Sequence, residues 1–194
     1  TASQTKAIKN INTDKEFNIS LLHGVTGSGK TEVYLNLVSD IINKNQAALI
    51  LVPEINLTPQ LHKVFSTRFN GEIGLYHSKQ TPLQRFKVWS KARSGNIRIV
   101  IGTRSAIMNP ILNLGLIIID EEHDQSFKQS EGFKFSAREL GIKRAQKEDI
   151  PILLGSATPS LSVLKLVEEN KVTKINMPER VDGRKPPSLI ILDI

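Results

Sequence analysis

The sequence predicts an α/β fold with a mostly parallel sheet covered by helices on both faces. Three observations indicate it. Short strand-like runs alternate with helix-like segments along the 194 residues. The strand-like runs are apolar throughout, which is typical of parallel strands buried on both faces. A glycine-rich motif lies between the first such run and the helix that follows it.

Apolar spacing and helix-breaking residues define the elements in chain order. A short helix over 3–11 and a polar loop over 12–18 precede the first strand, 19–22. Further strands are expected over 46–52, 73–76, 97–101, 116–119, 152–154 and 172–176. Further helices are expected over 31–42, 58–69, 136–147 and 161–169, with another beginning at Pro82.

The end of the sequence differs from the rest in composition. Proline and charged residues dominate 178–188, which indicates a linker, and 188–194 is again strand-like. We therefore expect one domain over 1–177, a connecting segment over 178–194, and a longer parent protein.

The segment from Gly24 to Thr31 matches G-x-x-x-x-G-K-[ST] in full. Its glycines allow backbone N–H groups to turn toward phosphates, and the following helix adds positive charge at its N-terminus. We expect Lys30 to reach the β- and γ-phosphates of ATP and the Thr31 hydroxyl to ligate Mg²⁺. The expected nucleotide ligands in this loop are Gly24, Val25, Thr26, Gly27, Ser28, Gly29, Lys30 and Thr31.

A run of acids follows the most apolar strand, where 120–123 read DEEH. An acidic surface turn is the alternative, but ligand sites of α/β proteins lie at the carboxyl ends of strands. We expect Asp120 to hold Mg²⁺ through water, since this ion keeps most of its hydration. Glu121 is expected to orient or deprotonate the attacking water. Lys30, Asp120 and Glu121 are therefore the candidate catalytic residues.

Net charge is +7, which favours a polyanionic partner. Between residues 61 and 100 there are eight basic residues and one acid, Glu72, so this stretch alone carries +7. Aromatic residues are interleaved with the charges, at Phe65, Phe69, Tyr76, Phe86 and Trp89. Two interpretations stay open: helices with solvated basic faces and aromatics in the core, or a surface that binds a polyanion.

Several classes of protein are excluded or disfavoured. Cysteine is absent, so this chain forms no disulfide and no cysteine–zinc site. No apolar run approaches the ~20 residues of a membrane span, and the first residues lack a signal-peptide pattern. We expect a cytoplasmic protein without a membrane partner.

Five segments together resemble a known family: LLHGVTGSGKTEVY (21–34), LVPEINLTPQ (51–60), GTRSA (102–106), IIIDEEHD (117–124) and LGSATPS (154–160). Their sequences and their order along the chain are similar to motifs I, Ia, Ib, II and III of DExH helicases of superfamily 2, and in particular of the bacterial primosomal replication-restart helicases. The resemblance covers nearly the whole chain. It implies a RecA-like P-loop NTPase fold, as the first of two lobes.

The resemblance also implies residue roles. Gln4 resembles the glutamine that reads adenine, with an ordinary surface glutamine as the alternative. Thr103 and Arg104 would contact the DNA backbone. The residues that would relay the nucleotide state toward DNA are His123, Ser156 and Thr158. A purely structural histidine is the alternative for His123.

Residues 126–138 resemble the aromatic-rich loop of the same family. Aromatic side chains would stack on unpaired bases while cations hold phosphates. A loop packed against the sheet is the alternative, and Gly132 with its polar neighbours favours exposure. The expected DNA contacts here are Phe127, Lys128, Phe133, Phe135 and Arg138.

By resemblance, the chain is the N-terminal ATP-binding lobe of an ATP-dependent 3′-to-5′ DNA helicase acting in replication restart and primosome assembly. Expected partners are single-stranded and forked DNA and primosome proteins; expected cofactors are ATP and Mg²⁺, with zinc only in the missing part. The second lobe and its arginine finger are missing, so the isolated fragment should be inactive. Alternatives are another DExH motor on RNA or DNA, or a regulatory module that binds nucleotide without hydrolysis.

Overall fold

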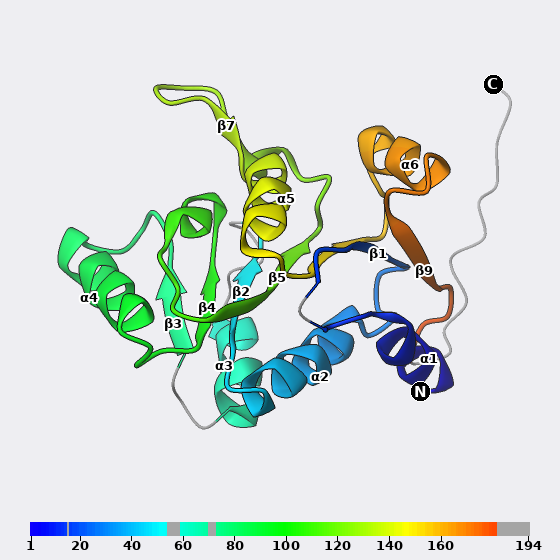
Figure 1. Cartoon of the computed structure of the whole chain (residues 1–194), viewed down its shortest axis with the longest axis horizontal. Helices are drawn as coiled ribbons and strands as arrows, with labels where there is room; N and C mark the ends of the chain where they lie inside the picture. Colours follow the sequence, from blue (N-terminus) through cyan, green and yellow to red (C-terminus); the bar gives the residue numbers. More distant parts are fainter. Residues whose placement is uncertain (15, 54–58, 70–72, 182–194) are drawn as a thin grey trace, which may run out of the picture.

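The computed structural model describes residues 1–14, 16–53, 59–69 and 73–181. Seven strands form one sheet in the order β3-β4-β2-β5-β8-β1-β9, and every neighbouring pair is parallel (Figure 1). The strands are β1 (Ile19–Gly24), β2 (Ala47–Leu51), β3 (Ile73–Tyr76), β4 (Ile99–Gly102), β5 (Leu114–Asp120), β8 (Ile152–Ser156) and β9 (Thr173–Met177). The expected parallel sheet is confirmed.

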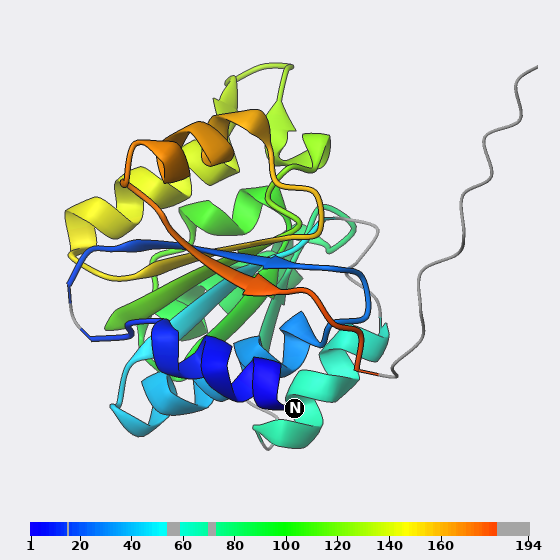
Figure 2. The ribbon, with the colours of Figure 1, turned by 90° about the vertical axis from the view of Figure 1, so that its right-hand side faces the viewer.

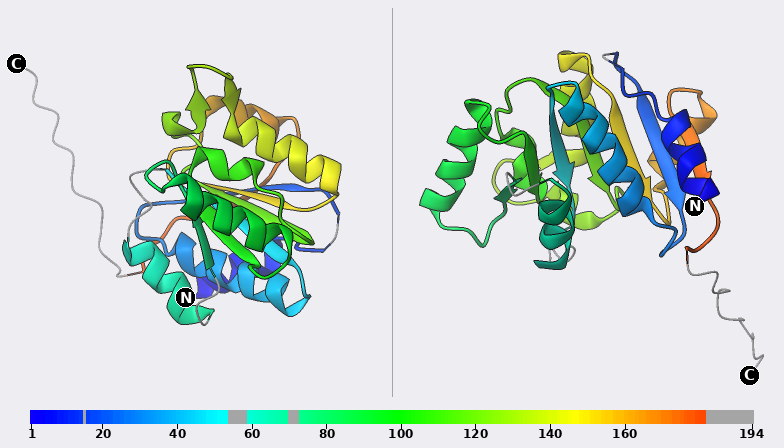
Figure 3. Two further views of the ribbon diagram at one scale, coloured as in Figure 1. Left: turned by 90° about the vertical axis from the view of Figure 1, so that its left-hand side faces the viewer. Right: turned by 90° about the horizontal axis from the view of Figure 1, so that it is seen from below.

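Helices cover both faces of this sheet, as Figure 2 shows. One layer consists of α1 (Ala2–Asn10), α2 (Lys30–Asn43) and α3 (Pro59–Arg68). The other contains α5 (Ala137–Glu148), α6 (Leu161–Glu168) and the 3₁₀ helix η2 (Arg104–Met108). Seen from below in Figure 3, α4 (Pro82–Arg93) lies at one edge of the sheet and α1 at the other. Among the described residues, no helix has the length and apolarity to cross a bilayer.

Strand β5 illustrates why the sequences of the strands are continuous apolar runs. Ile117 and Ile119 lie in the core against α5 and η2, whereas Leu116 and Ile118 lie in the core against α2. All four side chains are fully buried. Because successive side chains point to opposite faces, a strand covered by helices on both sides must be apolar at every position.

The expected elements are present, with ends that differ by a few residues. The helix expected at Pro82 is α4, and a capping box between Thr81 and Gln84 fixes its start. Short elements escaped prediction: η2, η3 (Gln125–Phe127) and the antiparallel pair β6 (Lys128–Gln129) and β7 (Phe135–Ser136). Of the expected linker only 178–181 are described; the strand-like run over 188–194 lies outside the described residues. The domain division at residue 177 stays a prediction.

The aromatic residues of the basic stretch divide between core and surface. Phe65 of α3 is fully buried, as the core interpretation expected. Phe86 of α4 is 61% exposed, and its neighbour Leu83 is 62% exposed. The core interpretation is therefore wrong for α4, where Ala92 is the buried residue.

Phe127 corrects the expected DNA-binding set. Its side chain is 1% exposed and belongs to the core beneath α5. The Arg104 guanidinium donates to the carbonyls of Ser126 and Lys128, at 3.2 and 2.6 Å, and so fixes the backbone on either side of Phe127. A ring held inward in this way cannot stack on a base.

Replacing Phe127 with alanine should lower the free energy of unfolding by about 3–5 kcal/mol, because a large buried side chain leaves a cavity. Phe133→Ala is the matched control, since Phe133 is 73% exposed and its loss should cost no more than about 0.5 kcal/mol. Denaturant unfolding of both variants measures the difference. Equal, small losses would place Phe127 outside the core.

Candidate functional site

Three motif-bearing loops meet at one edge of the sheet. The phosphate loop follows β1, the DEEH segment follows β5, and the segment 156–160 follows β8, which lies between them. Since the three strands are parallel, all three loops leave from the carboxyl end. Segments far apart in the sequence are thereby brought into hydrogen-bond distance.

The phosphate loop has the backbone that its glycines predict. Gly27 and Gly29 adopt left-handed φ angles of +80° and +82°, and Gly29 caps the N-terminus of α2. A Cβ on Gly24 would come within 2.6 Å of the Ser28 Oγ, so a larger residue there would displace the Ser28 side chain. The Ser28 Oγ is buried and lacks a hydrogen-bond partner among the described residues. A cradle of this kind, with an unsatisfied donor inside it, fits a phosphate group.

Lys30 reaches across this loop toward the DEEH segment. Its Nζ donates to the Gly24 carbonyl at 3.0 Å and lies 3.4 Å from the Glu121 Oε1. Glu121 itself has a φ of +50°, a strained conformation for a residue other than glycine. Lys30 and Glu121, both expected to be catalytic, are thus adjacent. Thr31 follows in the first turn of α2.

Asp120 is held by a residue that sequence reasoning missed. The Tyr34 hydroxyl donates to the Asp120 Oδ1 at 2.8 Å. Burial raises the pKa of Asp120, although the Tyr34 hydrogen bond and the Lys30 charge act in the opposite direction. Burial, followed by the Asp120 charge, also raises the pKa of Tyr34. Tyr34 lies one helical turn after Lys30, so its spacing from the phosphate loop was the available signal.

The second glutamate, Glu122, was not predicted to have a role. It is 2% exposed, and its Oε1 accepts from the Ser160 N–H at 2.7 Å. Its Oε2 accepts from the Ser160 hydroxyl at 2.9 Å and from the Arg138 Nη1 at 2.7 Å. Glu122 therefore joins the loops after β5 and β8 to the start of α5.

The same contacts correct the prediction that Arg138 binds DNA. Its guanidinium also donates to Glu139, Ser160 and Ser162. Burial acts to lower the pKa of Arg138, but the hydrogen bonds to Glu122 and Glu139 outweigh it and raise the pKa. Arg138 turns inward because the buried Glu122 carboxylate would otherwise be uncompensated.

The three expected coupling residues lie together. The His123 Nδ1 is 2.8 Å from the Ser156 Oγ, and its Nε2 is 3.3 Å from the Thr158 Oγ1. The Thr158 N–H donates to the Ser156 Oγ at 3.0 Å. The His123 Nδ1 is also 3.7 Å from the Glu121 Oε2. A continuous polar path therefore runs from Glu121 to Thr158, whereas its use as a relay stays a prediction.

Gln4 lies beside the phosphate loop. Its side chain donates from Nε2 to the Gly29 carbonyl at 3.3 Å, and the residue is 9% exposed. The surface-glutamine alternative is therefore wrong. Its expected contact with adenine stays a prediction.

Two of the remaining candidate DNA contacts line a polar cleft of about 280 Å³, and the other three lie on the neighbouring hairpin. Thr103 and Arg104 both line it, Thr103 being 8% exposed. Beyond the cleft, β6 and β7 form a hairpin whose tip carries the exposed Phe133. The centroids of the Phe133 ring and the partly buried Phe135 ring are 5.9 Å apart. Lys128 is exposed on the same hairpin. These five residues stay candidates for DNA contact.

Asp120→Asn should stabilise the metal-free protein at neutral pH, by on the order of 1 kcal/mol, because burial disfavours the charged carboxyl. The pKa of Asp120 is raised in the folded state, so that state binds the proton more tightly than the unfolded one. The stability that Asp120 contributes through this difference in proton affinity is therefore fully present below pH 3.8, the ordinary pKa. It is lost as pH rises through the raised value. The advantage of the variant should appear over the same interval.

Thermal unfolding of both proteins across this pH range, with chelator present, measures the effect. Asp40→Asn on the exposed surface of α2 is the matched control and should show no such dependence. A destabilised Asp120→Asn protein at neutral pH would mean that the carboxylate charge is needed for folding.

Comparison with known proteins agrees with this arrangement. The family model for DEAD/DEAH box helicases matches residues 1–167. The replication restart protein PriA of Haemophilus influenzae is 47% identical over 178 residues, which cover 92% of this chain and 24% of that protein. PriA of Bacillus subtilis is 41% identical over 179 residues, covering 92% of this chain and 22% of that protein.

A solved structure shares the fold. The structure of RecG bound to a three-way DNA junction matches with a TM-score of 0.67 and 27% identity, covering 95% of this chain and 24% of that one. The chain spans about a quarter of the length of the curated relatives it matches. The RecA-like fold is therefore confirmed, and the chain belongs to the DEAD/DEAH box helicase family.

Proposed function

We propose that this chain is the ATP-binding lobe of an ATP-dependent DNA helicase that acts in replication restart. The observation that carries the proposal is the meeting of Lys30 with Glu121 beside a loop able to cradle phosphate. The 47% identity to a replication restart protein supports the cellular role. Hydrolysis would take place between this lobe and a second one elsewhere in the protein.

Each residue of the site has a task that its position allows. Lys30 would neutralise charge on the β- and γ-phosphates. Thr31 and Asp120 would hold Mg²⁺, which when bound supplies positive charge beside the phosphates; Mg²⁺ sites commonly use only one or two protein ligands. Tyr34 keeps the Asp120 Oδ1 in place. Glu121 would orient the attacking water, and Gln4 would read adenine from beside Gly29.

DNA would bind over η2 and the β6–β7 hairpin. Supporting this, the cleft at Thr103 and Arg104 is polar and basic, and the exposed Phe133 offers a ring for stacking. RecG, of similar fold, was solved on a three-way DNA junction. The path from Glu121 through His123 and Ser156 to Thr158 would connect nucleotide state to movement of the lobes along the strand.

The wider role follows from the same resemblance. The full protein would translocate 3′ to 5′, act on single-stranded and forked DNA, and assemble with primosome proteins in the cytoplasm. Any zinc would be held outside this chain, which has no cysteine.

Lys30→Ala in the full-length protein should lower the ATPase rate by about 100-fold or more, because the variant loses a charge aimed at the transferred phosphate. Affinity for single-stranded DNA should persist, since the DNA candidates lie on η2 and the hairpin. Lys44→Ala, at the exposed far end of α2, is the matched control and should keep full activity. Steady-state ATPase and DNA-binding assays measure both. Wild-type turnover by Lys30→Ala would refute the phosphate-loop assignment.

A further inference from the structure

Helix α4 presents a face that the fold does not use. It is securely formed, with Pro82 in its first turn and the Thr81–Gln84 capping box at its start. Nevertheless Leu83 and Phe86 are more than 60% exposed. An ordinary surface helix buries its apolar stripe, so the exposed Leu83 and Phe86 on α4 require another explanation.

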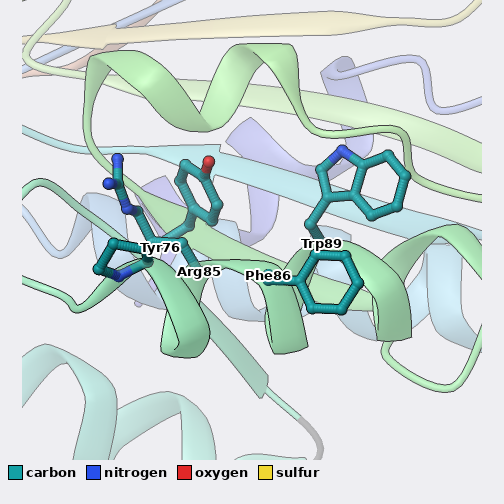
Figure 4. Close-up of a pocket in the computed structure, with 5 residues that line it drawn as sticks. Tyr76, Arg85, Phe86 and Trp89 are labelled. Carbon is teal, nitrogen blue, oxygen red and sulfur yellow. The ribbon is translucent and has the colours of Figure 1, made fainter.

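A groove runs along this face. It has a volume of about 350 Å³ and is lined by Tyr76 of β3 and by Pro82, Arg85, Phe86 and Trp89 of α4. In Figure 4, Tyr76, Arg85 and Trp89 rise on the same side of the helix, and Phe86 lies beside Trp89. The Phe86 and Trp89 rings are stacked, with centroids 6.1 Å apart and planes 15° apart. The Arg93 guanidinium lies 5.3 Å from the centroid of the Trp89 ring.

Arg85 links the groove to the polar cleft at η2. It lines both, together with Tyr76 and Trp89 on one side and Thr103 and Arg104 on the other. Its Nε is buried and lacks a hydrogen-bond partner among the described residues. An unsatisfied guanidinium N–H between an aromatic groove and a cleft with hydroxyl and arginine side chains fits an anionic ligand that also has a flat ring.

The charge of the surrounding surface has one sign. Helix α4 carries Arg85, Lys87, Lys91 and Arg93 and has no acid. Within the described segments 59–69 and 73–102 there is likewise no Asp or Glu. Cations interleaved with aromatic rings form the usual surface for single-stranded nucleic acid, where rings stack on bases and cations follow the phosphates.

We propose that the α4 groove binds one unpaired base of single-stranded DNA, while Arg85 contacts the adjoining phosphate in the cleft at η2. The strand would thus continue past Arg104 to the β3 edge of the sheet. This inference rests on the DNA binding proposed above and extends it to residues outside the helicase motifs.

The test uses the full-length protein and a fluorescent single-stranded oligonucleotide, with affinity measured by anisotropy. Phe86→Ala should weaken binding about five- to tenfold, as expected for the loss of one stacked base. Leu83→Ala is the matched control: it has the same exposure on the same helix but does not line the groove, so affinity should be unchanged. Circular dichroism verifies that both variants remain folded.

Abasic substitutions along the oligonucleotide identify stacking directly. The wild type should lose about five- to tenfold affinity at one abasic position, and Phe86→Ala should be indifferent to that position. Arg85→Gln should reduce the slope of log affinity against log salt concentration by about one. Lys87 lines neither the α4 groove nor the cleft at η2, so Lys87→Gln should change this slope less.

The outcomes separate this inference from the proposed function. If Phe86→Ala keeps full affinity and the same abasic profile while DNA still stimulates ATPase, the groove proposal is wrong and the helicase assignment stands. The other contrary outcome is a groove that binds an acidic, phenylalanine-containing peptide. If Phe86→Ala abolished that peptide binding and left DNA affinity intact, the groove proposal would likewise be wrong, and the groove would be assigned to a protein partner. A full-length protein with no DNA affinity at all would contradict the proposed function itself.

Discussion

The parallel alignment of β5, β8 and β1 is the constraint on which the rest of the molecule depends. It requires strands that are apolar on both faces, and it sends three loops out from one edge of the sheet. Once the strands are paired, Lys30 and Glu121 come within 3.4 Å although they are far apart in the sequence. The site is thus a consequence of sheet topology, and its chemistry comes from the residues at the strand ends.

Placing carboxylates at such an edge has a cost, and each is compensated differently. Glu122 is almost fully buried and is satisfied by Arg138 and by two donors of Ser160, so it acts as a structural tie. The Asp120 Oδ1 accepts from the Tyr34 hydroxyl, and burial raises the pKa of this carboxyl, so its negative charge is only partly compensated. Glu121 lies between Lys30 and His123 and remains partly exposed. Three consecutive acids therefore have three different environments.

Periodicity and local motifs were sufficient for the sheet and for the phosphate loop, because these depend on short-range patterns. They also marked Lys30 and Glu121 as catalytic candidates, whereas the contact between the two follows from the pairing of distant strands. These patterns could not predict whether a given side chain points into the core or toward solvent. Phe127 and Arg138 belong to an aromatic and basic loop, yet η3 turns one into the core and Glu122 draws the other inward. From the sequence, Tyr34 is an ordinary core residue of a helix. In the structure, β5 places Asp120 within hydrogen-bond distance of its hydroxyl. For Phe86 the sequence left both a core position and a surface position open, and α4 places the side chain on the surface.

The central claim is that Glu121 acts on the water of hydrolysis, separately from phosphate binding by the loop. Single-turnover ATP hydrolysis by full-length Glu121→Gln tests it most directly. With the loop and Lys30 unchanged, the variant should bind ATP with near wild-type affinity, while the hydrolysis step slows by about 100-fold or more. Hydrolysis at the wild-type rate by Glu121→Gln would contradict the assignment.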